Sequence, residues 1–143
     1  MSSKRSGFTL IEVLIVVVIM AVLAATIIPQ FSTSTKDAED SQIEFNVHTL
    51  RSQIELYKVQ HGGSYPPITN NLKALTVKTN ADGTTTGTPT IGPYLLEIPV
   101  NGRTGAATVT ASTTGTEKTG GGWLYDAATG KIWANSPVED ETP

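Results

Sequence analysis

The sequence contains no cysteine, and this absence excludes several kinds of chemistry at once. Without thiols the chain forms no disulfide, offers no thiol nucleophile and builds no thiolate zinc site. The two histidines, His48 and His61, form no zinc-binding motif. Gly130-Lys131-Ile132 lacks the upstream glycine and the hydroxyl residue of a phosphate-binding loop. The sequence therefore contains no catalytic constellation, and we predict that the protein is not an enzyme.

Basic residues are also few, with 10 Lys and Arg against 13 Asp and Glu and a net charge of −3. Binding of nucleic acid depends on clustered basic side chains, so the composition predicts no nucleic-acid partner. The 143 residues leave room for one small domain beyond the apolar N-terminal segment.

Charge is nearly absent from Phe8 to Ile28, where Glu12 is the one ionisable side chain. A helix of this length extends about 31 Å, which matches the hydrocarbon thickness of a bilayer. Lys4 and Arg5 precede the segment and no basic residue follows until Lys36. This asymmetry predicts a transmembrane helix over residues 8–30 with its N-terminus in the cytoplasm.

Glu12 is the exception within this segment. A carboxylate in a membrane costs about 2.5–3.5 kcal/mol at the centre and less near the interface, so it indicates a function and a partner. Cleavage after Gly7 would create a cationic amine on Phe8, and a neighbouring copy could bring its amine to this carboxylate. The alternative is that Glu12 lies close enough to the headgroups to stay hydrated.

The short basic leader, the GFTLIE sequence of residues 7–12 and the apolar run resemble the class III signal of type IV pilins and type II secretion pseudopilins. The resemblance implies a leader over residues 1–7, cleavage between Gly7 and Phe8 by prepilin peptidase, and N-methylation of Phe8. It also implies that Glu12 recruits the Phe8 amine of the adjacent subunit during assembly. Pro29 lies where many pilins have a helix-kinking proline.

The resemblance implies a subunit of a type II secretion pseudopilus, most similar to the major pseudopilin. Its implied partners are further copies of itself in a homopolymer, minor pseudopilins, an inner-membrane assembly platform, prepilin peptidase and, before assembly, membrane lipid. The implied location is a single-pass inner-membrane protein with a periplasmic C-terminal domain, which then enters a periplasmic or surface filament. Many type IV pilins close a C-terminal loop with a disulfide, so the absence of cysteine favours a pseudopilin.

Three other functions stay open at this point. One is a major or minor type IV pilus subunit in adhesion or motility, the second is a DNA-uptake pilin, and the third is an enzyme domain on a membrane anchor. A conventional signal peptide cleaved before Ala25 is a rival interpretation of the N-terminus, and Glu12 within the apolar region argues against it.

Residues 31–61 are predicted to continue the helix as an amphipathic half. Apolar residues recur at the spacing of a narrow helical stripe: Ile43, Val47, Leu50, Ile54 and Tyr57. The stripe is expected to pack on the C-terminal region, with a coiled-coil surface for other subunits as the alternative. The helix is expected to kink or loosen at Pro29 and to end at Gly62-Gly63.

Residues 62–136 are predicted to form a periplasmic globular region of loops and antiparallel hairpins, which makes the fold class α+β and pilin-like. A short helical turn is expected at residues 71–76. The Tyr65-Pro66 step and residues 91–99, IGPYLLEIP, are similar to major pseudopilins. The match then departs, because those proteins tend to have Asp-Pro-Trp-Gly where residues 100–103 read VNGR, and Asn101-Gly102 is a turn signal.

Two β features are predicted near the C-terminus. The alternation over residues 107–111 indicates a short, exposed strand or hairpin. The aromatic-rich runs at residues 122–125 and 131–134 flank a loop from Asp126 to Gly130, which is typical of a hairpin. Its aromatic side chains are expected to cover the long helix, with a carbohydrate-stacking surface as the alternative.

Calcium is the one cofactor worth considering, because major pseudopilins bind it in a C-terminal loop. Asp126 and Asp140 are weak candidate ligands, and the acidic turn of the family is missing here, so the prediction is that no cofactor is required. Residues 137–143 are expected to be a solvated acidic tail.

Overall fold

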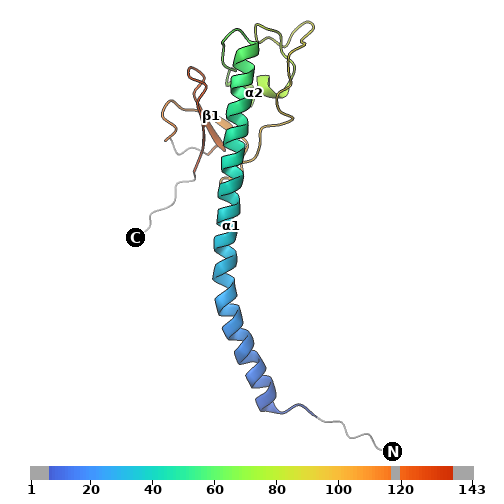
Figure 1. The fold of residues 1–143 in the computed structure, drawn as a ribbon, viewed down its shortest axis with the longest axis vertical. Coiled ribbons are helices and arrows are strands. Elements are labelled where there is room, and N and C mark those ends of the chain that lie inside the picture. Colours follow the sequence, from blue (N-terminus) through green and yellow to red (C-terminus); the bar gives the residue numbers. More distant parts are fainter. Residues whose placement is uncertain (1–6, 117–119, 137–143) are drawn as a thin grey trace, which may run out of the picture. The chain divides into compact units, whose positions relative to one another are not determined.

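The computed structural model describes residues 7–116 and 120–136, with the side chains of residues 27–34 excluded (Figure 1). The elements in order are α1 (Leu10–Gln60), α2 (Thr69–Thr76), β1 (Val109–Ala111), β2 (Trp123–Tyr125) and β3 (Ile132–Ala134). The chain divides into two compact units, Met1–Ala38 and Glu39–Pro143. The fold class is α+β, as expected. The predicted acidic tail and most of the predicted leader lie outside the described residues.

Helix α1 runs without interruption for 51 residues, through Pro29, and confirms the single long helix expected from the sequence. A kink at Pro29 stays a prediction. The helix ends as the glycines indicated: the Gly63 amide donates to the Lys58 carbonyl at 2.9 Å, and Gly62 adopts a φ of +63°. This pattern satisfies a carbonyl that the last turn would otherwise leave without a partner.

Within residues 7–116 and 120–136, no helix is both long enough and apolar enough to be identified as a membrane span.

The five stripe residues of α1 are all buried, which confirms the amphipathic half of the helix. Leu50 and Ile54 have no exposed surface, and Tyr57 is 1% exposed. They share one core with side chains from α2, β2 and β3: Leu72, Leu75, Trp123, Tyr125 and Ile132. In the Glu39–Pro143 unit, α2 and the sheet therefore lie against α1.

The short helical turn predicted at residues 71–76 is present as α2, but its first turn is unusual. Asn70, Asn71 and Leu72 adopt left-handed backbone angles, with φ of 49°, 62° and 56°. Such a conformation costs about 1–2 kcal/mol per residue, and burial of the Leu72 side chain offsets part of it. The turn also directs the Asn71 amide at β1, where it donates to the Ala107 carbonyl and accepts from the Val109 amide.

The hairpin predicted at the C-terminus is confirmed. β2 and β3 pair antiparallel, with Tyr125 opposite Ile132 and Trp123 opposite Ala134. The connecting turn starts at Asp126, whose carbonyl accepts from the Gly130 amide at 2.8 Å, and closes at Gly130 with a φ of +71°.

The expectation of a wholly antiparallel region is wrong for β1. This strand pairs in parallel with β2, with Thr110 opposite Leu124, so the three-stranded sheet is mixed. The segment between the two strands is long enough to return the chain to the same end of the sheet, as a parallel pair requires.

The aromatic residues of the hairpin divide between its two faces. Trp123 and Tyr125 are fully buried in the core that covers α1, as predicted. Trp133 pairs opposite Leu124 and so lies on the other face, where its ring contacts Gly115 closely enough to leave no room for a Cβ there. The expectation that the aromatic residues cover the helix therefore holds for β2 and not for Trp133.

Asn101 begins the predicted turn and also joins three segments of the unit. Its side chain is completely buried and donates to the Gly122 carbonyl at 2.7 Å and the Asn135 carbonyl at 2.9 Å. Its Oδ1 accepts from the Arg103 amide at 3.0 Å. One buried amide thus supports the start of β2 and the end of β3.

We predict that Asn101→Ala destabilises the chain by about 1–3 kcal/mol, because the buried amide that bridges the Gly122 and Asn135 carbonyls is removed. Urea unfolding of the detergent-solubilised chain, followed by tryptophan fluorescence, measures the change. Asn46→Ala is the matched control, since it removes only an exposed 3.4 Å contact to the Val100 carbonyl. Equal unfolding midpoints for the two variants would contradict the bridging role of Asn101.

Candidate functional site

The candidate site is the N-terminus of α1, where residues 7–12 carry the signal identified in the sequence. Thr9 directly precedes the helix, and Glu12 lies in its first turn. The Thr9 amide and hydroxyl both donate to Glu12 Oε2, at 2.7 and 2.8 Å, and the Glu12 amide donates to the Thr9 hydroxyl at 3.3 Å. This arrangement is a capping box, which satisfies amides that the first helical turn leaves free.

Thr9 is a site residue that the sequence reasoning missed. The signal for it was present, because Thr9 followed by Glu12 three residues later is the Ser/Thr-x-x-Glu pattern that begins many helices. Glu12 therefore has a partner within its own chain. Among the described residues, no donor contacts its second oxygen, Oε1, so the carboxylate keeps capacity for a cation from another molecule. Pairing of Glu12 with the Phe8 amine of a neighbour stays a prediction.

Helix α1 presents apolar side chains on every side near its start. Phe8 is 86% exposed and Leu10 84%, and every large apolar side chain from Ile11 to Leu23 is at least 49% exposed. A helix that is apolar all round is stable only when something covers it. Thr26 follows these apolar residues, and its hydroxyl donates to the Leu23 carbonyl at 2.9 Å. The hydroxyl therefore has a hydrogen-bond partner without water.

Residues 100–103, VNGR, depart from the major pseudopilin pattern, and in the Glu39–Pro143 unit their Arg103 forms an ion pair. The Arg103 guanidinium contacts the Asp40 carboxylate of α1 and donates to the Ser136 hydroxyl at 2.9 Å. Exposed pairs of this kind contribute about 0–1 kcal/mol, so the pair orients the loop more than it stabilises the unit.

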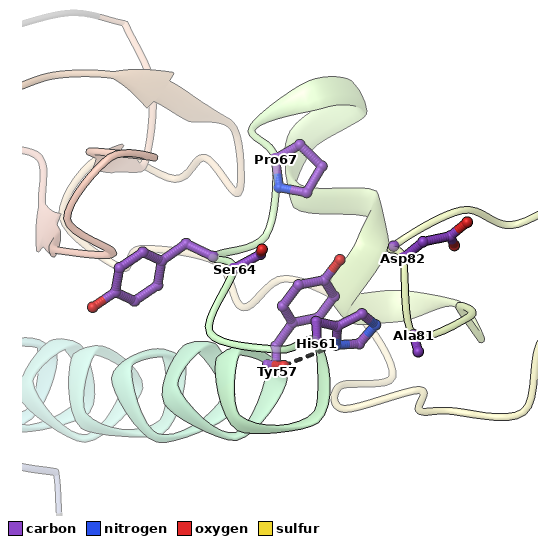
Figure 2. Close-up of a pocket in the computed structure, with 8 residues that line it drawn as sticks. Tyr57, His61, Ser64, Pro67, Ala81 and Asp82 are labelled. Carbon is purple, nitrogen blue, oxygen red and sulfur yellow. Dashed lines mark hydrogen bonds between the residues drawn. The ribbon is translucent and has the colours of Figure 1, made fainter.

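A small cavity of about 150 Å³ lies at the C-terminal end of α1, between Tyr57, His61, Pro67 and Asp82 (Figure 2). His61 stacks on Tyr57 with ring centroids 3.6 Å apart. Its two ring nitrogens lie 2.8 Å from the Tyr57 carbonyl and 2.8 Å from the Thr79 hydroxyl. Because both nitrogens are occupied, His61 is a structural residue.

The acidic group at this cavity, Asp82, accepts two hydrogen bonds on its Oδ1. Hydrogen bonds from the Thr84 hydroxyl and amide lower the pKa of Asp82, and Figure 2 shows its carboxylate pointing away from the Tyr57 ring. Burial and the nearby Asp82 charge raise the pKa of Tyr57, which stays neutral at physiological pH. The hydrogen bonds of His61 therefore go to Tyr57 and Thr79, and none of the described bonds joins it to the Ser64 hydroxyl that also lines the cavity.

The calcium candidates have no cluster around them in the part of the chain that the structure describes. Asp126 Oδ1 accepts from the Ala128 amide at 2.9 Å and Oδ2 accepts from the Thr129 hydroxyl at 2.7 Å. These bonds lower the pKa of Asp126, the Thr129 hydroxyl most, and engage both oxygens in the hairpin turn. Asp140 lies outside the described residues, and residues 7–116 and 120–136 contain no group of three His, Asp or Glu that could hold a metal. Calcium binding stays a prediction.

Comparison with known families agrees with the N-terminal signal. Residues 2–28 match the family described as the prokaryotic N-terminal methylation motif. The match includes Gly7 and Phe8 of the predicted cleavage point, and Thr9 and Glu12 of the capping box.

Several curated proteins are similar over a longer stretch. The type II secretion system core protein G of Pseudomonas aeruginosa is 31% identical over 98 residues, which cover 68% of this chain and 68% of that protein. The proteins of that name from Pectobacterium carotovorum and Dickeya chrysanthemi are each 29% identical over 99 residues, or 69% of this chain. The alignments span 56% and 63% of those two relatives. No solved structure is similar at a significant level.

We predict that Thr9→Val weakens the first turn of α1 by about 0.5–2 kcal/mol, because valine keeps the shape of threonine and loses the capping hydroxyl. Amide hydrogen exchange of residues 10–13 in the full chain measures the effect. Thr26→Val is the control, since its hydroxyl bonds carbonyls one turn back and caps nothing. Unchanged exchange in Thr9→Val would show that the hydroxyl does not hold the turn.

Proposed function

The chain belongs to the family of type II secretion system core protein G, and from this we propose its function. The proposed function is that of a structural subunit of a type II secretion pseudopilus, which polymerises through its N-terminal helix to support protein export. The observation that carries it is the exposed apolar start of α1, which directly follows the processing signal and contains a single carboxylate.

The first proposed step is processing. Prepilin peptidase cuts between Gly7 and Phe8 and methylates the new N-terminus of Phe8. The Thr9 cap supports this, since it begins the helix just after the cleavage point and leaves Gly7 and Phe8 outside it. A peptide bond that lies outside the helix is more accessible to a peptidase than one inside it.

The second proposed step is storage in the inner membrane, with the N-terminus in the cytoplasm and residues 62–136 in the periplasm. The support is the apolar run over residues 8–28 and the basic residues that precede it. Lipid covers the exposed side chains of residues 8–26 at this stage, and residues 8–30 form the membrane anchor.

The third proposed step is assembly into a filament with further copies, on an inner-membrane platform and with minor pseudopilins. Contacts between helices replace contacts with lipid, so the gain comes from close packing and from polar pairs. Glu12 pairs with the Phe8 amine of a neighbour and sets the register. A buried charge of this kind specifies an arrangement more than it stabilises it.

Deleting the gene tests the proposed function directly. We predict loss of export of the secreted proteins, measured in the culture medium, with twitching motility and surface adhesion unchanged. Re-expression of the wild-type chain should restore export. Normal export together with lost motility or adhesion would assign the chain to a type IV pilus instead.

Two substitutions of Glu12 separate its two roles. Glu12→Gln keeps the capping box, because glutamine serves at that position, and removes the negative charge. Glu12→Ala removes both. We predict that both variants are cleaved after Gly7 and that both lose most of their filament, measured by sedimentation of sheared fibres.

The outcome of Glu12→Gln decides between the roles. A normal yield with Glu12→Gln and a reduced yield with Glu12→Ala would assign Glu12 to helix capping alone. Normal yields from both variants would remove Glu12 from assembly altogether.

A further inference from the structure

The Asn101-Gly102 pair carries a chemistry of its own, apart from its place in a turn. Asparagine is a thermolabile residue, because the backbone nitrogen that follows it can attack its side-chain carbonyl carbon. A glycine at the next position leaves that nitrogen without steric cover, since glycine has no Cβ. Asn101 is the one asparagine of this sequence that glycine follows directly.

The folded chain holds the side chain of Asn101 in place through three hydrogen bonds. Its Nδ2 donates to the Gly122 carbonyl at 2.7 Å and to the Asn135 carbonyl at 2.9 Å. Its Oδ1 accepts from the Arg103 amide at 3.0 Å. Closing a ring onto the Gly102 nitrogen moves the amide out of this position, so these three bonds oppose the reaction.

The backbone of Asn101 is fixed as well. Its amide donates to the Ala106 carbonyl at 2.9 Å, and its carbonyl accepts from the Gly105 amide at 2.8 Å. The residue has no exposed surface, so the water that would complete the reaction does not reach it. A buried and bonded group of this kind becomes reactive only when the surrounding segment opens.

We propose that Asn101-Gly102 is a self-modification site that reacts only when the Glu39–Pro143 unit is unfolded. The Gly102 nitrogen forms a bond to Asn101 Cγ, the bond from Cγ to Nδ2 breaks, and Nδ2 leaves as ammonia with the proton of the Gly102 amide. Water then opens the cyclic imide at either carbonyl, which gives aspartate or isoaspartate at position 101. This inference goes beyond the proposed function and does not depend on it, because no partner, filament or membrane takes part.

The reaction makes unfolding irreversible, because neither product fits the folded unit. Aspartate replaces the Nδ2 donor by an oxygen, which would face the Gly122 and Asn135 carbonyls without a proton, and a buried charge that has no partner is costly. Isoaspartate adds a carbon to the main chain at the point where Asn101 pairs with Ala106. A copy that has stayed unfolded is thus marked and does not return to the folded state.

Gly102 provides a matched control. A Cβ at this position would lie 3.7 Å from its nearest neighbour, Glu39 Cγ, which is an ordinary contact, and the backbone there is not left-handed. Gly102→Ala therefore keeps the bonds of Asn101 in the folded chain. In the unfolded chain its methyl group covers the backbone nitrogen and slows the attack.

The test compares the detergent-solubilised full chain in mildly alkaline buffer with and without denaturing urea. Tandem mass spectrometry of proteolytic fragments measures the acid formed at each asparagine, and Asn80, which alanine follows, is the internal reference. We expect acid at position 101 to form at least about tenfold faster in the unfolded chain than in the folded chain. In the unfolded chain it should form several-fold faster than at Asn80, and several-fold faster than in Gly102→Ala.

Refolding after removal of the urea tests the consequence. The refolded fraction, measured by tryptophan fluorescence, should decline as the modified fraction rises, and Gly102→Ala held unfolded for the same time should keep its refolding yield. Equal rates at Asn101 in the folded and unfolded chain, or equal rates at Asn101 and Asn80 in urea, would overturn the proposal. Full refolding of the modified chains would refute the irreversible step. Each of these outcomes leaves the proposed function standing.

Discussion

The packing of one stripe of α1 against β2 and β3 is the interaction on which the Glu39–Pro143 unit depends. The strands are three residues long, so their ladders supply few hydrogen bonds, and strands this short are not stable without a packed face. Leu50, Ile54 and Tyr57 provide that face, and Trp123 and Tyr125 cover it completely. Each such side chain contributes about 1.5–3 kcal/mol when it leaves water. The unit is therefore held together by the buried stripe of the helix on which it packs.

Side-chain amides complete what the short strands leave unpaired. Asn71 bonds the outer edge of β1, Asn101 bonds carbonyls before β2 and after β3, and the Asn135 side chain donates to the Gly121 carbonyl at 2.6 Å. Buried backbone groups without partners would cost about 1–3 kcal/mol each, so these amides matter in a chain that has no disulfide. The left-handed turn at residues 70–72 has the same purpose, because it aims Asn71 at β1.

The N-terminal site gives one carboxylate a local role, to which the proposed function adds an intermolecular one. Glu12 caps its own helix through Oε2, so the proposed pairing of Oε1 with a neighbour's amine would not compete with starting the helix. The apolar start of α1 that follows is exposed on every side and needs a cover that brings no charge. In the proposed function, lipid and then further copies supply that cover.

Much of the fold and of the candidate site could be predicted from the sequence, because the deciding forces act between near neighbours in the chain. The helical spacing of Ile43 to Tyr57 identified the buried face, and the Asp126 and Gly130 pair identified the hairpin turn. The GFTLIE signal of residues 7–12 identified the site, and the Thr9 cap was readable in the same residues.

The parallel pairing of β1, the left-handed turn at Asn71 and the bridging role of Asn101 were decided only by the tertiary structure. All three depend on contacts between residues that are far apart in the chain. The way these segments meet in space decides which backbone groups need a side-chain partner. A local sequence pattern does not predict these contacts. The outward position of Trp133 has the same origin, since the register with Leu124, and not the aromatic character of the residue, determines its face.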